Sequence, residues 1–167
     1  ARHGRGPHAR LRDGVVRLRR ANGATQSPAD YFRQLSATCG LPETLCRVNL
    51  EKIRYVLHGM EMVLDGLTRG LDLTVLDSGW GECDGRKMSF LPQTEALGAI
   101  LPSNSPGVHN LWVPAPALKI PLVLKPGREE PWTPYRLIQA FIAAGCPAEA
   151  FGFYPTDHEG AAEVLKS

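Results

Sequence analysis

Residues 96–112 read ALGAILPSNSPGVHNLW, and this stretch decides how the fold is interpreted. The apolar run 97–101 predicts a short buried strand. The segment 102–106 follows at once, and its prolines and serines surround Asn104 in what we expect to be a tight turn. The pattern therefore puts an amide side chain just beyond the end of a buried strand.

The residues after this turn alternate between strand and helix patterns joined by short links. Such alternation favours a parallel sheet with helices packed against it. We therefore expect an α/β fold with an incomplete Rossmann-like parallel sheet and flanking helices. Pro114 and Pro116 are expected to kink or break the first helix. The further strands are predicted at 121–125 and 151–154, and the helices at 108–118, 134–144 and 158–165.

The chain before this region carries two helical patterns. Ser27 and Pro28 suit the cap and first turn of a helix over 29–38. Apolar residues at steps of three and four then predict a second helix over 50–67, with Asn49 as its cap. These helices are expected to precede the sheet.

The period changes after residue 70. The alternation in LDLTVLD, residues 71–77, predicts a half-buried strand. The turn at Asp84 and Gly85 predicts a β-hairpin, which is either an arm for pairing between subunits or a surface ribbon. We divide the chain into a basic N-terminal arm, a segment of helices and hairpin, and a partial dinucleotide-binding domain. Their bounds are 1–24, 25–95 and 96–167.

The net charge of the 167-residue chain is only +2, but basic residues gather at its start. Residues 1–23 hold seven arginines and one acidic residue, so the rest of the chain is mildly acidic. We interpret this segment as a solvated arm, and an arm for nucleic acid or a membrane surface is the alternative. No aromatic residue lies among the arginines, so base stacking is unsupported and we do not expect a nucleic-acid partner.

Cysteine usage and hydropathy bear on the compartment. No apolar run approaches the roughly 18 residues of a membrane-spanning helix, and no signal-peptide pattern is present, so no membrane partner is expected. The cysteines show no CxxC pair and no histidine at zinc spacing. We therefore expect reduced thiols in the cytoplasm and no metal site. The four cysteines are Cys39, Cys46, Cys83 and Cys146.

Two polar residues follow the first two predicted strands. Asn104 comes after the first strand and Lys125 closes the second. Since ligands of open α/β sheets bind beyond the carboxyl ends of the strands, both side chains are expected at one edge. An amide donor and an ammonium there suit an oxyanion and a phosphate or ribose.

Three motifs in this order resemble the aldehyde dehydrogenase superfamily. The turn PSNSP at 102–106 resembles the family's Pro-Trp-Asn-Phe-Pro, although serines replace the aromatics beside the asparagine. VLKP at 123–126 matches a family motif, and GAA at 160–162 resembles the Gly-Ala-Ala at a helix start. Together they cover roughly 97–165. The family binds its dinucleotide without a G-x-G-x-x-G loop, and this sequence has none.

The resemblance implies roles for four residues. Asn104 resembles the asparagine whose amide helps to form the oxyanion hole, and Lys125 resembles the lysine that contacts the adenosine ribose of NAD(P). Gly160 resembles the glycine against which the adenine packs. Arg128 stands where many NAD-preferring members have glutamate, and arginine suits a 2′-phosphate. Glu129 is next to it and could restore the acid, so NAD and NADP both remain open as cofactors.

The resemblance also implies an NAD(P)-dependent oxidoreductase. The family oxidises an aldehyde through a cysteine thiolate, with hydride passing to nicotinamide and a glutamate activating the deacylating water. An acyl-CoA reductase branch, which reduces an acyl thioester, is an alternative. The family's nucleophile lies far downstream of the asparagine, and neither Cys83 nor Cys146 stands at its position. We therefore expect this chain alone to be inactive and to be the first part of a longer enzyme.

A second hypothesis belongs to another class of protein. The missing nucleophile and the arginine-rich start also suit a non-catalytic nucleotide-binding or interaction module. The family analogy implies a homo-oligomer. The identity of the aldehyde stays open, because few pocket-lining residues can be recognised in the sequence.

Overall fold

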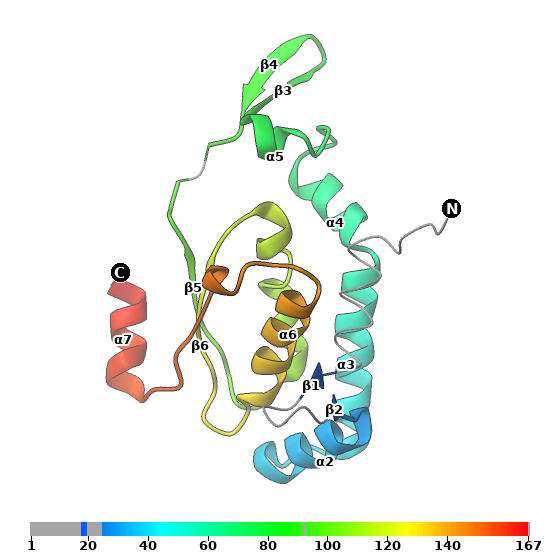
Figure 1. Ribbon diagram of the computed structural model, residues 1–167, viewed down its shortest axis with the longest axis vertical. Helices are drawn as coiled ribbons and strands as arrows, with labels where there is room; N and C mark the ends of the chain where they lie inside the picture. Colours follow the sequence, from blue (N-terminus) through cyan, green and yellow to red (C-terminus); the bar gives the residue numbers. More distant parts are fainter. Residues whose placement is uncertain (1–17, 20–24, 92, 167) are drawn as a thin grey trace.

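The computed structural model describes residues 18–19, 25–91 and 93–166 (Figure 1). Most of the arm predicted over 1–24 lies outside the described residues. Its described part is β1 (Leu18–Arg19), which pairs antiparallel with β2 (Thr25–Gln26). Within the described ranges, no helix is both long and apolar enough to cross a bilayer.

The first predicted helix is confirmed as α2 (Pro28–Cys39). The Ser27 hydroxyl accepts from the Asp30 amide at 3.1 Å, and the Asp30 carboxylate accepts from the Ser27 amide at 3.3 Å. This capping box satisfies two amides that would otherwise lack partners. Gly40 ends the helix with φ 74°, a left-handed conformation that glycine adopts at little cost.

The second helical pattern forms two helices, α3 (Glu43–His58) and α4 (Met60–Leu67), which meet at Gly59. Asn49 lies inside α3, so the prediction that it caps the helix is wrong. The helix begins earlier because the Pro42 carbonyl accepts from the Cys46 amide at 3.1 Å. Cys46 is buried and extends the apolar face by one turn.

The predicted strand over 71–77 is also wrong. Leu71 and Val75 are both buried and lie four residues apart, as on one side of a helical turn. The Asp72 carboxylate accepts from the Thr74 amide at 2.8 Å, and the short helix α5 (Val75–Ser78) follows. The pattern was ambiguous because residues four positions apart lie on the same face in a β-strand as well as in a helix.

The predicted hairpin is confirmed. Strands β3 (Trp80–Cys83) and β4 (Arg86–Ser89) pair antiparallel and project from the rest of the molecule (Figure 1). The turn residues Asp84 and Gly85 have φ values of 51° and 73°. Two successive positive φ angles suit the twist of a two-residue hairpin turn.

The chain after residue 96 forms a mixed α/β unit around a three-stranded parallel sheet, as the sequence predicted. Its order is β5-β6-β7, with bounds Leu97–Ile100, Leu122–Lys125 and Phe151–Phe153. Ile100 pairs with Lys125, and Leu124 pairs with Phe153. All three strands therefore end at the same edge.

The connections differ in part from the prediction. The segment between β5 and β6 forms two 3₁₀ helices, η1 (Pro106–Leu111) and η2 (Ala115–Leu118), because Pro114 cannot donate within a continuous helix. The helix α6 (Trp132–Ala143) leads through η3 (Ala148–Ala150) to β7, and α7 (His158–Lys166) follows β7.

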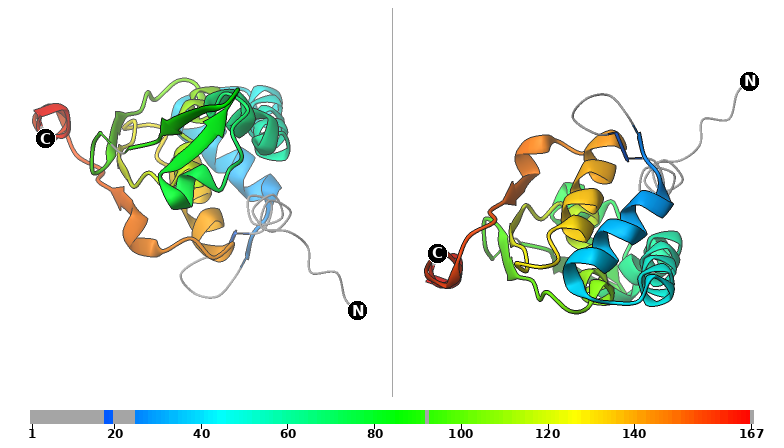
Figure 2. Two further views of the ribbon diagram at one scale, coloured as in Figure 1. Left: turned by 90° about the horizontal axis from the view of Figure 1, so that it is seen from above. Right: turned by 90° about the horizontal axis from the view of Figure 1, so that it is seen from below.

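Helices flank both faces of the sheet (Figure 2). Leu122 and Leu124 join the main core, which also contains α2, α3 and α6 side chains. The alternate residues of the strands face the other way, where α7 contacts β5 and β6. Gly98 lies so close to α7 that a Cβ atom there would come within 3.3 Å of Val164.

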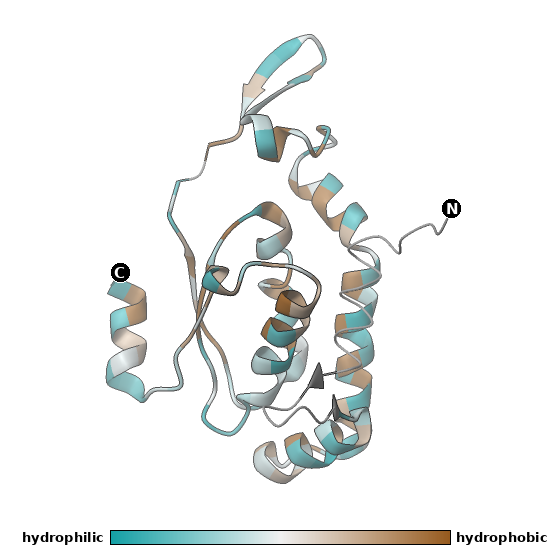
Figure 3. Cartoon of the chain, viewed as in Figure 1, coloured by the Kyte–Doolittle hydropathy of each residue, from teal (hydrophilic) through white to brown (hydrophobic). Residues whose placement is uncertain are grey.

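One hydrophobic core joins the helices before residue 96 to the sheet after it. Tyr31, Leu35, Ile53 and Leu57 belong to the same buried cluster as Leu122. In Figure 3 brown bands mark the apolar residues of α6, of which Leu137, Ile138 and Phe141 are buried in this core. The position of the sheet thus depends on packing against α2 and α3.

Candidate functional site

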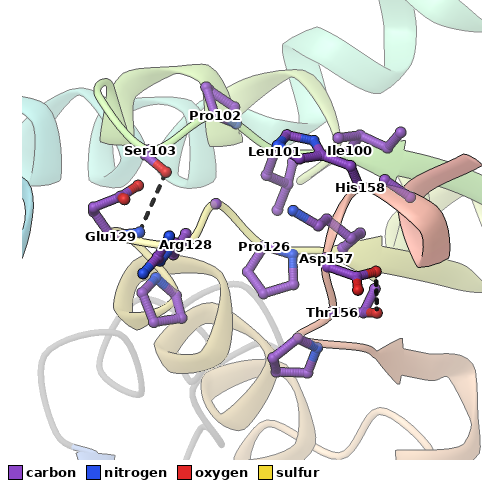
Figure 4. Close-up of a pocket in the computed structure, with 15 residues that line it drawn as sticks. Ile100, Leu101, Pro102, Ser103, Pro126, Arg128, Glu129, Thr156, Asp157 and His158 are labelled. Carbon is purple, nitrogen blue, oxygen red and sulfur yellow. Dashed lines mark hydrogen bonds between the residues drawn. The ribbon is translucent and has the colours of Figure 1, made fainter.

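The carboxyl ends of the three parallel strands surround a cavity of about 670 Å³ (Figure 4). Loops after β5, β6 and β7 and the start of α7 contribute to its wall. Backbone hydrogen bonds continue past the strand ends, from the Leu101 amide to the Lys125 carbonyl at 2.8 Å and from the Tyr154 amide to the Leu124 carbonyl at 2.9 Å. The rim is therefore a continuation of the sheet, in the place where α/β folds bind ligands.

Lys125 is the last residue of β6 and lines this cavity. Strand alternation directs it away from the core side chain of Leu124 and toward the face that α7 covers. The residue is only 8% exposed. Among the described residues its ammonium has no hydrogen-bonded acceptor, although its charge helps to lower the pKa of the nearby Glu129 carboxyl. A largely buried side chain whose ammonium stays open to the cavity suits a polar ligand.

The loop after β6 places charged residues on the rim. Arg128 and Glu129 are exposed and line the cavity. The Glu129 amide donates to the Ser103 hydroxyl at 3.2 Å, which joins this loop to the loop after β5. The same hydroxyl, with help from the Arg128 and Lys125 charges, lowers the pKa of the Glu129 carboxyl.

Gly127 allows the two loops to approach closely. A Cβ atom at this position would lie 2.5 Å from the Pro102 carbonyl oxygen and 2.6 Å from the Ser103 amide nitrogen. Real Cβ atoms do not come that close to backbone, so only glycine fits. Gly127 thus brings the ends of β5 and β6 together on the same rim.

The start of α7 forms the far wall. The Asp157 carboxylate accepts from the Gly160 amide and the Glu159 amide, each at 3.1 Å, so Asp157 caps the helix. These hydrogen bonds lower the pKa of Asp157, and the bond from the Gly160 amide has the largest effect. Gly160 itself is beside the Thr156 side chain, and its neighbour Ala161 lines the cavity.

The four residues predicted from the sequence are brought to one region, but not into equal contact with the cavity. Lys125 and Arg128 line it, whereas Gly160 is one residue away from its lining. Asn104 is exposed and follows the lining residue Ser103, so its amide lies beyond the cavity wall. In the described structure Lys125 and Arg128 thus line the cavity themselves, whereas Asn104 and Gly160 are each next in sequence to a lining residue.

A buried polar network lies behind the rim, and sequence reasoning missed it. The Glu130 carboxylate accepts from the His109 ring at 2.8 Å, from the Thr133 amide at 2.8 Å and from the Thr133 hydroxyl at 2.6 Å. His109 and Glu130 are fully buried. The network ties η1, which follows the Asn104 turn, to the loop that carries Arg128.

The donor and acceptor of each hydrogen bond in this network can be assigned. The Trp112 ring N–H donates to His109 Nδ1 at 3.0 Å, so Nε2 carries the proton that is donated to Glu130. The Thr133 hydroxyl uses its proton on Glu130, so the Tyr31 hydroxyl donates to Thr133 across 2.6 Å. Burial raises the pKa of Tyr31, which keeps this donor protonated. His109 is thus a neutral structural residue.

Other features of the described chain are less suited to bind a polar ligand. A second cavity of about 830 Å³ at the foot of the hairpin is lined mainly by apolar side chains, and the ammonium of its Lys119 pairs with Asp77. Neither Cys83 nor Cys146 lines the cavity at the strand ends. Among residues 18–19, 25–91 and 93–166, no cluster of three metal-ligating side chains occurs.

Comparisons with protein-family models, with curated proteins and with solved structures each gave no match. The ammonium of a largely buried lysine, an exposed guanidinium and a capped helix start surround one cavity beside the ends of parallel strands.

Proposed function

We propose that the cavity at the strand ends binds the dinucleotide NAD(P), and that the chain belongs to an oxidoreductase of the aldehyde dehydrogenase type. The observation that carries the proposal is Lys125, a buried lysine that faces a cavity without an acceptor from the described protein. A bound group rich in hydroxyl and phosphate oxygens would supply that acceptor. The cavity volume lies within the range of small-molecule and cofactor sites.

Three parts of the rim have separate tasks in this proposal. Lys125 donates to the ribose hydroxyls, and the exposed Arg128 pairs with a 2′-phosphate if the cofactor is NADP. The start of α7, near Gly160, receives the adenine. Bound NAD(P) would supply the hydride acceptor for the oxidation of an aldehyde, or the hydride donor for the reduction of an acyl thioester. The cysteine nucleophile that either reaction needs is absent from this cavity's wall.

Asn104 has the remaining chemical task. Its amide would donate to the oxygen of a carbonyl compound as negative charge develops there. Asn104 is exposed next to the rim, so it is accessible to a substrate that approaches from outside the cavity. In a catalytically active form of the protein, Asn104→Ala should lower kcat roughly 10²-fold or more with little change in dinucleotide affinity.

Calorimetric titration with NAD and with NADP tests the proposal. Lys125→Met should weaken binding of both by roughly tenfold or more, since a charge-assisted contact contributes about 1.5–3 kcal/mol. Lys119→Met is the matched control, because it removes the same charge from an exposed lysine outside this cavity. Arg128→Ala should weaken NADP binding only.

Two outcomes would count against this function. Failure of the protein to bind either dinucleotide would reject the cavity as their site. Equal losses in Lys125→Met and Lys119→Met would show a general effect of charge. Binding without hydride transfer to or from any aldehyde or acyl thioester would favour the alternative of a non-catalytic nucleotide-binding module, for which the absence of a cysteine at the cavity wall is the supporting observation.

A further inference from the structure

A stripe of exposed apolar side chains runs along α3 and α4. Val48 is 50% exposed, and Tyr55 and Met62 are each 80% exposed. Val48 and Tyr55 lie seven residues apart on one side of α3, and Met62 follows after seven more residues in α4, just beyond the junction at Gly59. Leu45, 48% exposed, extends the stripe toward the start of α3.

This stripe is separate from the core face of the same helices. The residues that bury α3 and α4 against the rest of the molecule are Leu50, Ile53, Leu57, Met60 and Leu64. The two helices therefore carry an apolar face that no described element covers. A single apolar side chain on a surface is ordinary, but an aligned series of large ones is typical of an interface.

The charges beside the stripe are arranged so that it complements itself. Beside its first half the basic residues Arg47, Lys52 and Arg54 outnumber the acidic residues Glu43 and Glu51, whereas the acidic Glu61 and Asp65 lie beside its second half. Arg47 is in contact with Glu43 at 3.6 Å, but its side chain is 55% exposed and remains accessible. Two copies in antiparallel orientation would therefore bring the basic half of each against the acidic half of the other.

We propose that two copies of this chain pair antiparallel through the face formed by Leu45, Val48, Tyr55 and Met62. Tyr55 lies near the two-fold axis and meets its own counterpart, and Val48 meets Met62 of the partner subunit. A shallow hollow of about 660 Å³, lined by Val48, Lys52 and Tyr55 among others, receives that methionine. Arg47 then reaches Glu61 of the partner subunit.

The length of the face is adequate for such a pair. The helices contain 16 and 8 residues, which corresponds to about 36 Å at the rise of an α-helix. A self-complementary surface used twice by one symmetry axis closes as a dimer and does not extend into a filament. The exposed Tyr55 supplies the kind of aromatic anchor found at the centre of interfaces.

Sedimentation of the full chain over a wide concentration range tests the dimer. The wild type should show the mass of two chains, and Tyr55→Glu or Met62→Glu should raise the dimer dissociation constant at least about tenfold. Leu111→Glu is the matched control, since Leu111 is 85% exposed but lies outside this face. Arg47→Glu should weaken the dimer, and the added change Glu61→Arg should restore it.

A cross-link tests the position of the axis. Under oxidation, Tyr55→Cys should give a disulfide between two chains on a non-reducing gel, whereas Leu111→Cys should remain a single chain. Circular dichroism verifies the fold of each variant, and exposed positions such as these tolerate substitution. A single-chain mass at every concentration would overturn the proposal. A dimer that withstands both glutamate variants, or that Leu111→Glu weakens equally, would also overturn it, and lack of the Tyr55→Cys cross-link would reject the axis.

Discussion

Glu130 and His109 share a hydrogen bond of 2.8 Å between two side chains that are fully buried. His109 belongs to η1, which follows β5, and Glu130 belongs to the loop that follows β6. The bond therefore joins the two loops whose outer residues form the rim of the cavity. It holds these two loops in position, although neither His109 nor Glu130 lines the cavity.

Removal of the Glu130 carboxylate should be severely destabilising. Glu130→Ala leaves His109, the Thr133 amide and the Thr133 hydroxyl buried without their acceptor, and we expect a loss of about 3–5 kcal/mol in the free energy of unfolding. Urea denaturation measures it. Glu129→Ala is the control, because Glu129 is the neighbouring acidic residue but is exposed, so its removal should change the stability little. Similar losses in both variants would contradict the role assigned to the network.

Two glycine-to-alanine changes should act in opposite directions. Gly127→Ala forces a methyl group against the Pro102 carbonyl, so it should lower the free energy of unfolding by about 1–3 kcal/mol and weaken dinucleotide binding. Gly66→Ala lies in α4, where nothing is within 4 Å of the added carbon, and should raise stability by roughly 0.5–1 kcal/mol. Thermal and urea unfolding measure both. A stable Gly127→Ala would show that the loops can separate freely.

The charge of Lys125 should lower the free energy of unfolding of the protein without a ligand. Lys125→Met keeps the apolar stem and removes a charge that no described acceptor bonds, so the free energy of unfolding should rise by about 1 kcal/mol. Lys119→Met, at an exposed ion pair, should stay within about 0.5 kcal/mol of the wild type. Urea denaturation without any dinucleotide compares the two. A destabilised Lys125→Met would mean that the ammonium has a structural task.

The cap of α7 predicts a pH dependence. The amides of Gly160 and Glu159 lower the pKa of Asp157 in the folded protein below the ordinary value of an aspartate. A depressed folded pKa stabilises the protein above the unfolded pKa, and this stabilisation is lost as the pH falls through the folded pKa. Wild type should therefore be more stable than Asp157→Asn at neutral pH, and the difference should shrink below about pH 4. Thermal unfolding of both proteins across that range provides the measurement, and a constant difference would contradict the assignment.

The elements that the sequence predicted well are those with a strong local pattern. The strand at Leu97–Ile100, the parallel strand at Leu122–Lys125 and the hairpin turn at Asp84 each carry a signal within a few residues. The prediction that the first of these strands is buried is wrong, because Leu97 and Ile100 are each 40% exposed. The prediction for residues 71–77 was wrong because this local pattern is ambiguous: Leu71 and Val75 fit both the two-residue period of a strand and the period of a helix. Only contact with the rest of the molecule selects between them.

The candidate site divides in a similar way. Lys125 was predicted at the rim because strand ends of a parallel sheet share one edge, and the register of Ile100 with Lys125 confirms that geometry. Glu129 and Glu130 look alike in the sequence, yet one is exposed and the other fully buried. Nothing local distinguishes them, so the network around Glu130 could not be predicted.

The sequence by itself determined the alternation of strands and helices, the turn around Asn104 and the charge that closes β6, because backbone preferences and hydrophobic periodicity act over a few residues. The tertiary structure decided which polar groups lose contact with water. Tyr31 meets Thr133 across 102 residues of chain, and Glu130 meets His109 across 21. Burial is a property of the assembled core, and it is burial that makes Glu130 a structural anchor and places Lys125, only 8% exposed, at the cavity.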